Sequence, residues 1–218
     1  MQAQSSNRRV NDRRKEILRA AAACFRDAGF HAAGMRDIAQ RAGMTVGNLY
    51  YYFRNKEELL AFCQEETLNR LERRLRRARA APRRADGRLW MLVAGHVACL
   101  NDGVGGSLAH LEVPGLDAAG GSRLRQSRDR YERAIRAVIR EGRAQGVFRD
   151  TDEKLAAMAI LGAANWTVRW FDPSRGASAV EIGAAFADQL VRGLLAEGVV
   201  LERPEEHEIP FDLENDHG

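Results

Sequence analysis

Residues 35–53 combine a turn and a helix start in a way that suits nucleic-acid binding. Gly43 can adopt the positive φ angle that reverses the chain after a short helix. The hydroxyl of Thr45 can accept a hydrogen bond from a backbone N–H two or three residues further on, which caps a second helix. Hydrophobic residues follow this cap at helical spacing: Val46, Leu49, Tyr50 and Phe53. A supporting helix, a turn with glycine and a recognition helix make up the helix-turn-helix pattern of DNA-binding proteins.

Motifs for catalysis and for metal binding are missing from the sequence. It contains no GxSxG, no P-loop, no GxGxxG after a predicted strand and no HExxH or HxxxH spacing. The three cysteines are far apart and odd in number, which argues against a disulfide framework or a zinc site and favours a reducing compartment: Cys24, Cys63 and Cys99. We therefore predict a protein that is not an enzyme and that uses no cofactor and no metal.

Composition and length indicate a soluble globular protein. The chain has 218 residues, of which 45% are hydrophobic and 29% are charged. It has no run of 18 apolar residues, and its first ten residues lack the apolar region of a secretory signal. These features predict a cytoplasmic protein with no membrane partner.

The net charge of +4 is unevenly distributed along the chain. Residues 1–84 contain 19 Lys and Arg against 9 Asp and Glu, a net charge of +10, and residues 85–218 contain 15 against 21, a net charge of −6. The basic N-terminal third suggests a polyanionic partner for that part alone. The arginines around the start of the first helix (Arg8, Arg9, Arg13 and Arg14) are either a solvated arm or contacts to phosphate or the minor groove.

Apolar periodicity predicts helices along the chain, about nine in all. The first runs from Val10 to Ala28 and ends at Gly29. The helices expected after the linking helix cover Arg88–Leu100, a short element around Ser107–Glu112, Arg123–Gln145, a segment from the Asp152 cap to Trp170, and one from the Ser178 cap to Glu197. The resulting domain scheme is a disordered basic arm (1–9), a helix-turn-helix domain (10–55), a linking helix (56–81), a ligand-binding and dimerisation domain (82–201) and an acidic disordered tail (202–218).

The helix-turn-helix and its flanks resemble the DNA-binding signature of TetR-family repressors. The resemblance is specific over about residues 10–62 and lies in Gly29-Phe30, Met35 to Ala39, Ala42-Gly43, Val46 to Tyr50, Phe53 and Lys56 to Leu60. It implies an all-α homodimer with a three-helix DNA-binding head and a larger helical body that binds a ligand and dimerises. It also implies a repressor that binds a palindromic operator and is released by a small-molecule effector.

The resemblance assigns DNA contacts to individual residues. Thr45 and Tyr50 would bind phosphates, while Val46 and Asn48 would face base edges, since valine suits a thymine methyl and asparagine an adenine. Gly47 would allow the helix to approach the groove closely. The other predicted contacts come from Arg36, Tyr51, Tyr52 and Lys56. The chain departs from the family at Ala33-Gly34, where a hydroxyl residue usually caps the supporting helix, and at Tyr52, where the family often has histidine.

Small residues on the last two predicted helices favour dimerisation, because they permit the close helix approach of a four-helix bundle across a two-fold axis. Packing within one chain is the alternative. The predicted interface consists of Ala156, Ala159, Gly162, Ala163, Gly183, Ala184, Ala187, Val191 and Leu194.

Trp166 and Trp170 stand four residues apart, so both would project from one helix face, with Asn165 and Arg169 beside them. They are either aromatic core residues or walls of a ligand pocket, to which His96 and Tyr131 would also contribute. This segment is similar to a TetR-family branch that includes sensors of acyl-CoA thioesters, which implies an acyl-CoA effector.

The basic stretch Arg70–Arg79 is interpreted as a solvated helix face. Two other functions stay open, a helical enzyme that binds a small molecule and a constitutive architectural DNA-binding protein.

Overall fold

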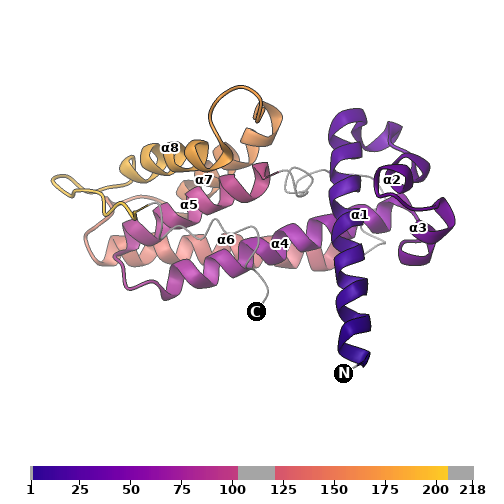
Figure 1. Ribbon diagram of the computed structural model, residues 1–218. Helices are drawn as coiled ribbons and strands as arrows, with labels where there is room; N and C mark the ends of the chain where they lie inside the picture. The colour runs from indigo at the N-terminus through magenta and orange to yellow at the C-terminus, as the bar shows by residue number, and fades with distance from the viewer. Residues whose placement is uncertain (1, 103–120, 206–218) are drawn as a thin grey trace. The chain divides into compact units, whose positions relative to one another are not determined.

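The chain forms helices that cluster into two compact units. The computed structural model describes residues 2–102 and 121–205, and within these ranges it contains eight α-helices, one 3₁₀ helix and no strand (Figure 1). The first unit is Met1–Leu68 with Asp102–Arg125, and the second is Asn69–Asn101 with Gln126–Gly218. The predicted all-α fold class is confirmed. The short helix expected around Ser107–Glu112 lies outside the described residues, as does the tail from residue 206.

The first unit, the head, contains α1 (Gln2–Ala32), α2 (Met35–Arg41), α3 (Val46–Tyr52) and the first part of α4 (Lys56–Ala80). Its core is formed mainly by Ile17, Ala21, Phe25, Phe30, Ile38, Leu49, Phe53, Leu59 and Leu60. The helical path of α1 breaks at Gly29, whose φ of 79° and ψ of 160° are not helical, as predicted. In contrast, α1 begins at Gln2 and not at Val10 as predicted, since glutamine, alanine and arginine have favourable helix propensity.

Backbone hydrogen-bonding groups at the ends of α2 and α3 are satisfied locally. Gly43 has a φ of 61°, and Thr45 Oγ1 accepts a hydrogen bond from Asn48 N at 3.2 Å, as the sequence predicted. At the start of α2, where no hydroxyl is present, Gly34 N donates to Asp37 Oδ2 at 3.0 Å. Gly43 and the Thr45 contact therefore fix the turn between α2 and α3, and the contact of Gly34 with Asp37 fixes the start of α2.

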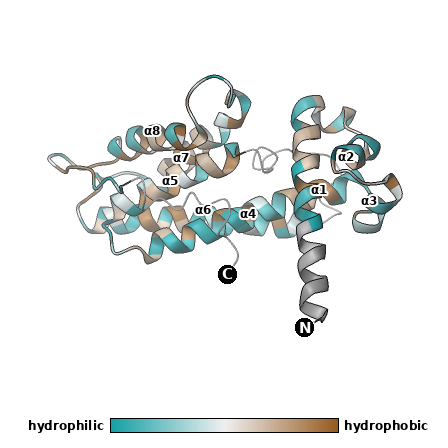
Figure 2. Cartoon of the chain, in the orientation of Figure 1, coloured by the Kyte–Doolittle hydropathy of each residue, from teal (hydrophilic) through white to brown (hydrophobic). Residues whose placement is uncertain are grey.

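The second unit, the body, is organised around α5 (Ala85–Asn101), whose residues Ala85–Leu100 are buried except for half-buried Arg88. Around α5 lie the later part of α4, α6 (Gly121–Ala144), α7 (Glu153–Trp166) and α8 (Ala179–Arg192). Figure 2 shows hydrophobic residues along α5 and a more hydrophilic α4. A Cβ atom at Gly183 would lie 2.5 Å from Ala94 O, so α8 contacts α5 through backbone atoms.

Two helices of the body end earlier than predicted. Asp152 and Ser178 cap α7 and α8 as expected, but α7 ends at Trp166 and continues as a 3₁₀ helix, η3 (Thr167–Arg169). The buried Thr167 hydroxyl donates to Ala164 O at 2.7 Å and thereby tightens this turn. Residues after Arg192 leave the helical path because Leu195 pairs with Phe148 in an isolated bridge and Ala196 N donates to Val147 O at 3.0 Å.

Residues 201–205 are packed against the body, although the sequence placed them in a disordered tail from residue 202. Buried Asp86 accepts hydrogen bonds from Glu202 N at 2.7 Å and from Arg84 Nη2 at 2.7 Å. Glu202 in turn forms an ion pair with Arg83 at 3.1 Å. Burial opposes ionisation of Asp86, but the contacts with Arg84 and Glu202 outweigh it and lower the pKa of the carboxyl group. This cluster anchors the chain after α8 to the start of α5.

Candidate functional site

Helix α3 presents one polar face to solvent and buries the opposite face in the head. Thr45, Gly47 and Asn48 are exposed, and the side chain of Tyr51 is 84% exposed. Tyr50 is exposed as well, whereas Leu49 is completely buried. The helix therefore keeps hydrogen-bonding groups available at its first two turns, where a recognition helix contacts base edges.

Two of the predicted base and phosphate contacts are partly buried. Val46 and Tyr52 pack against the head core and are half-buried. Gly47 has open space where a Cβ atom would be, so a groove wall can come close to the backbone there. At the start of α2, Arg36 is exposed.

The structure gives Lys56 a different role from the predicted phosphate contact. Its Nζ donates hydrogen bonds to Phe30 O at 2.7 Å, His31 O at 3.1 Å and Ala33 O at 3.1 Å. The ammonium group also lies 4.6 Å from the centre of the Phe30 ring. All three N–H groups are thus used to cap the end of α1, where carbonyl groups lack helical partners.

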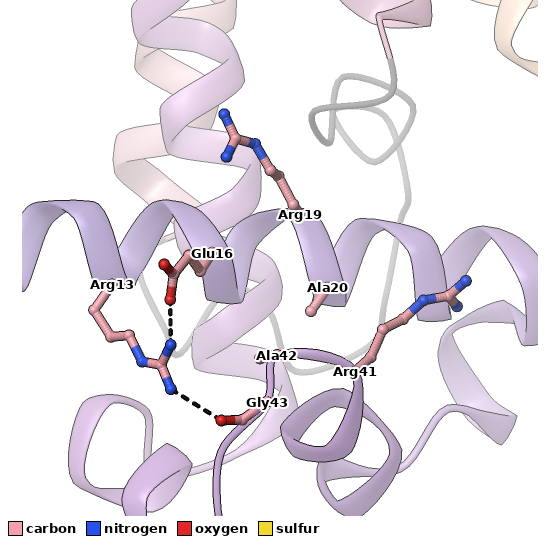
Figure 3. Close-up of a pocket in the computed structure, with 7 residues that line it drawn as sticks. All are labelled: Arg13, Glu16, Arg19, Ala20, Arg41, Ala42 and Gly43. Atoms are coloured by element: carbon pink, nitrogen blue, oxygen red, sulfur yellow. Dashed lines mark hydrogen bonds and ion pairs between the residues drawn. The ribbon is translucent and has the colours of Figure 1, made fainter.

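A shallow hollow of about 580 Å³ lies between α1 and the turn after α2 (Figure 3). It is lined by Arg13, Glu16, Arg19, Ala20, Arg41, Ala42 and Gly43. Arg13 pairs with Glu16 and donates to Gly43 O at 3.3 Å, while Arg41 pairs with Asp27 at 2.7 Å. Two of the three guanidinium groups therefore already have carboxylate partners, and the arginines also join α1 to the helix-turn-helix.

In the body, three of the predicted ligand residues form one buried polar chain. His96 Nε2 lies 2.8 Å from Asn165 Oδ1, and His96 Nδ1 lies 3.1 Å from the Tyr131 hydroxyl. Because the amide oxygen can only accept, His96 Nε2 carries the proton and the Tyr131 hydroxyl donates to Nδ1. Burial, together with the charge of Arg74, lowers the pKa of His96 to about 4, so the ring is neutral at pH 7. Burial also raises the pKa of Tyr131.

The other three predicted ligand residues lie on the surface at the end of α7. Trp166 is 65% exposed, and the Arg169 guanidinium lies 6.0 Å from its ring centre. Trp170 stacks on Phe186 with ring centres 6.0 Å apart. The predicted shared helix face of the two tryptophans is wrong, because the α-helix ends at Trp166.

Arg74 is buried beside this cluster, although the sequence patterns did not single it out. The basic stretch Arg70–Arg79 is predicted to form a solvated helix face, but Arg70 and Arg74 are buried. The sequence indicates this burial, because Leu71 and Leu75, three residues before and one residue after Arg74, are buried core residues on the same helix face. A charged residue inside an apolar helix stripe could therefore have been recognised.

Five of the nine predicted interface residues belong to the interior of the chain itself. Ala156, Gly183, Ala187, Val191 and Leu194 are buried. Ala184 is half-buried and packs against the same core, and Ala163 is half-buried as well. The remaining two, Ala159 and Gly162, are exposed. Together with Leu155, Met158 and Trp166 they form the apolar face that α7 leaves exposed. We call these residues the α7 stripe.

The three cysteines are all buried. Cys24, Cys63 and Cys99 carry free thiols. Within residues 2–102 and 121–205, no group of three or more His, Cys, Asp or Glu side chains is arranged to hold a metal ion. No helix in these ranges has both the length and the hydrophobicity needed to cross a membrane.

Comparison with known proteins covers both units. The family model for bacterial regulatory proteins of the tetR family matches residues 17–62, and that for the tetracyclin repressor-like C-terminal domain matches residues 82–194. The HTH-type transcriptional repressor KstR2 of Mycobacterium tuberculosis (strain H37Rv) is 29% identical over 193 residues, which cover 87% of this chain and 96% of KstR2.

Two solved structures share the fold. The TetR-family transcriptional regulator PfmR from Thermus thermophilus has a TM-score of 0.74 and 30% identity, with 83% of this chain and 99% of PfmR covered. AibR, solved in complex with isovaleryl coenzyme A and operator DNA, has a TM-score of 0.69 and 22% identity, with 84% and 98% covered. Since the C-terminal model alone spans more than half of the sequence and the N-terminal model covers the helix-turn-helix, this chain belongs to the TetR family of bacterial regulatory proteins.

Proposed function

We propose that the protein is a dimeric, sequence-specific transcriptional repressor that a small-molecule effector releases from its operator. The observation that carries the proposal is the exposed face of α3, which presents Gly47, Asn48 and Tyr51 while Leu49 anchors the helix in the head. KstR2 is a transcriptional repressor and PfmR a transcriptional regulator, which supports the same role here.

Base recognition is assigned to Asn48, with Val46 beside it. An asparagine side chain can form two hydrogen bonds to an adenine edge, worth about 1–3 kcal/mol of discrimination against the wrong base. Thr45 and Tyr50 would hold the phosphates on either side. The Thr45 hydroxyl oxygen accepts from Asn48 N, and its proton remains able to donate to a phosphate oxygen.

The test is a binding-site selection with the purified protein and random duplex DNA. The parent should enrich a palindrome with two half-sites, and Asn48→Ala should lose preference at one base pair of each half-site. Gln40→Ala, which changes an exposed polar residue at the end of α2, serves as the matched control. If Asn48→Ala selects the same bases as the parent, Asn48 does not read sequence. Enrichment of no sequence would instead favour an architectural DNA-binding protein.

The effector site is assigned to the body around His96, Tyr131 and Asn165, which are polar groups within an otherwise apolar interior. Binding sites for small molecules usually combine apolar walls with a few polar groups that fix orientation. AibR was solved with isovaleryl coenzyme A and operator DNA together, so this fold can hold an acyl-CoA. We propose an acyl-CoA thioester as the effector class, with Trp166 and Arg169 at the surface available to an adenine ring and a phosphate.

Release would follow from a population shift. An effector that binds better to a state with altered spacing of the two recognition helices lowers operator affinity by its differential affinity for the two states. Helix α4 is continuous from Lys56 to Ala80 and runs from the head into the body, so it is the element that would transmit the change. A panel of acyl-CoAs and free acids, added to the protein bound to its selected operator, should contain at least one compound that dissociates the complex. Turnover of a compound without operator binding would indicate an enzyme.

Dimerisation is assigned to Leu155, Met158, Ala159 and Gly162 of the α7 stripe, together with the exposed parts of α8. The stripe follows helical spacing and places large apolar side chains in solvent, which is typical of a surface that another protein covers. Ala159 and Gly162 leave room for close approach of a second helix. Two copies of one such surface form a two-fold interface, which holds two heads at a fixed separation.

A further inference from the structure

Arg74 on α4 is a buried cation whose hydrogen-bonding capacity is largely unused. The residue is only 6% exposed. Its Nε and Nη1 atoms are buried and have no hydrogen-bond partner among residues 2–102 and 121–205. In the part of the chain that the structure describes, no carboxylate lies within salt-bridge distance of its guanidinium group. A charge in this position is costly unless an anion accompanies it.

The fold makes room for this side chain inside the body. Its stem crosses α5 at Gly95, where a Cβ atom would lie 3.2 Å from Arg74 Cδ. The next residue is His96, on which the charge of Arg74 acts directly. The guanidinium group is therefore held next to the polar chain of Tyr131, His96 and Asn165.

The members of the polar chain beside Arg74 are electrically neutral and form hydrogen bonds with one another. His96 is uncharged at pH 7, and both of its ring nitrogens are used, one by the Tyr131 hydroxyl and the other by Asn165 Oδ1. Tyr131 is an uncharged phenol at that pH, because burial raises its pKa. The cluster therefore offers no negative charge to Arg74, and Arg74 is the member that retains unused donors.

We propose that Arg74 is the receptor for an oxyanion group of the effector, with a carboxylate as the first choice. A planar guanidinium group matches a carboxylate with two parallel hydrogen bonds, and such a pair is strongest where water is excluded. An acyl chain and a thioester are uncharged and cannot neutralise Arg74. The inference rests on the proposed effector site in the body. It adds that the end of the effector that is buried beside Arg74 carries an anionic group. Phosphate has the same chemistry and is the second source of such a group.

The test measures thermal melting of the purified protein without DNA, so that it is independent of repression. Arg74→Met keeps the apolar stem of the side chain and removes the charge, and Arg79→Met makes the same change at an exposed position of the same helix. The probes are octanoate and octanamide, which have the same chain length. The carboxylate is charged and only accepts hydrogen bonds, whereas the amide is neutral and its NH₂ group donates. Free coenzyme A and inorganic phosphate are the sources of phosphate. Octanoate should raise the melting temperature of the parent and of Arg79→Met, and octanamide should not.

Arg74→Met should melt several degrees above the parent in the absence of probes, because it removes an uncompensated buried charge. It should also lose the shift produced by octanoate. A shift produced by coenzyme A or phosphate instead of octanoate, and lost in Arg74→Met, would identify phosphate as the anion. An anion shift of Arg74→Met equal to that of the parent would show that the anion does not bind Arg74 and would overturn the proposal.

A second variant covers the case in which Arg74→Met does not fold. Arg74→Lys keeps the charge but cannot form the two parallel bonds, so it should bind octanoate at least ten-fold more weakly, on the order of one lost charged hydrogen bond. Unchanged affinity in Arg74→Lys would contradict the proposed geometry. If octanoate binds through Arg74 and yet no acid or acyl-CoA releases the operator, the anion site stands and the proposed repressor mechanism fails.

Discussion

Replacement of Lys56 by methionine separates the two roles that a lysine at the start of α4 can have. Methionine keeps most of the apolar stem and removes the ammonium group that donates to Phe30 O, His31 O and Ala33 O. If Lys56 caps α1, the variant should lose stability of the head. If it contacts phosphate, the variant should lose operator affinity, because one fewer counterion is released from the DNA when the protein binds.

The structure allows both effects to be estimated. Hydrogen bonds from a charged group contribute about 1.5–3 kcal/mol, and a cation–π contact at a partly exposed site contributes about 0.5–1 kcal/mol. Because Lys56 is half-buried and water can replace some of its contacts, we expect a loss of about 2 kcal/mol in the free energy of unfolding. For a chain of this length that corresponds to a fall in melting temperature of about 4–8 °C.

The assay combines thermal melting with operator affinity measured at several salt concentrations, well below the melting temperature. Each phosphate contact contributes about −0.9 to the slope of log affinity against log salt concentration. Lys56→Met should keep the slope of the parent, while Arg36→Ala, at the exposed start of α2, should make it less steep by about that amount if Arg36 binds phosphate. A Lys56→Met variant that melts within about 1 °C of the parent and loses one unit of slope would refute the capping role.

Three further predictions follow from the body of the protein. Gly183→Ala should lower the melting temperature, because its Cβ atom would lie 2.5 Å from Ala94 O, an overpacking cost of about 1–3 kcal/mol or more. An unchanged melting temperature would contradict the close contact of α8 with α5. His96 has a pKa of about 4 in the folded chain and about 6.5 when unfolded, so the unfolded state binds more protons between these values and stability should fall as pH decreases from 6.5 to 4. The free energy of unfolding, measured with denaturant across this range, should fall by about 3 kcal/mol less in His96→Gln than in the parent. Identical pH profiles of the two proteins would show that His96 is not buried as a neutral ring. Met158→Glu should convert the dimer to a monomer in size-exclusion chromatography with light scattering, because it places a charge on the exposed apolar face of α7. Ala144→Glu, at the exposed end of α6, should leave the dimer intact. A Met158→Glu variant that remains a dimer would place the interface elsewhere.

Local sequence patterns were sufficient for the helices and for their caps. Gly29 and Gly43 break the helical path because of their positive φ angles, and Thr45, Asp152 and Ser178 accept hydrogen bonds from the N–H groups that begin each helix. These contacts join residues that are two or three positions apart, so residue type and spacing determine them. The same short-range logic supported the helix-turn-helix and the family to which the chain belongs.

Local patterns were not sufficient where a side chain finds its partner far along the sequence. Lys56 donates to carbonyls that precede it by 23 to 26 residues, and His96 lies between Tyr131 and Asn165, which are 35 and 69 positions away. A small residue such as Gly183 fits either a dimer interface or an intrachain contact, and only the position of Ala94 decides between them.

The sequence by itself determined the all-α fold, the helix-turn-helix and the exposed positions of Gly47 and Asn48, since each depends on helical periodicity and on residues close in the chain. Only the tertiary structure decided that Lys56 caps a helix, that Trp166 lies at the surface, and that Arg74 is buried with no anion beside it in the part of the chain that the structure describes. The physical reason is that burial and charge compensation depend on which helices pack together, and helices that meet through distant residues leave no fixed spacing in the sequence.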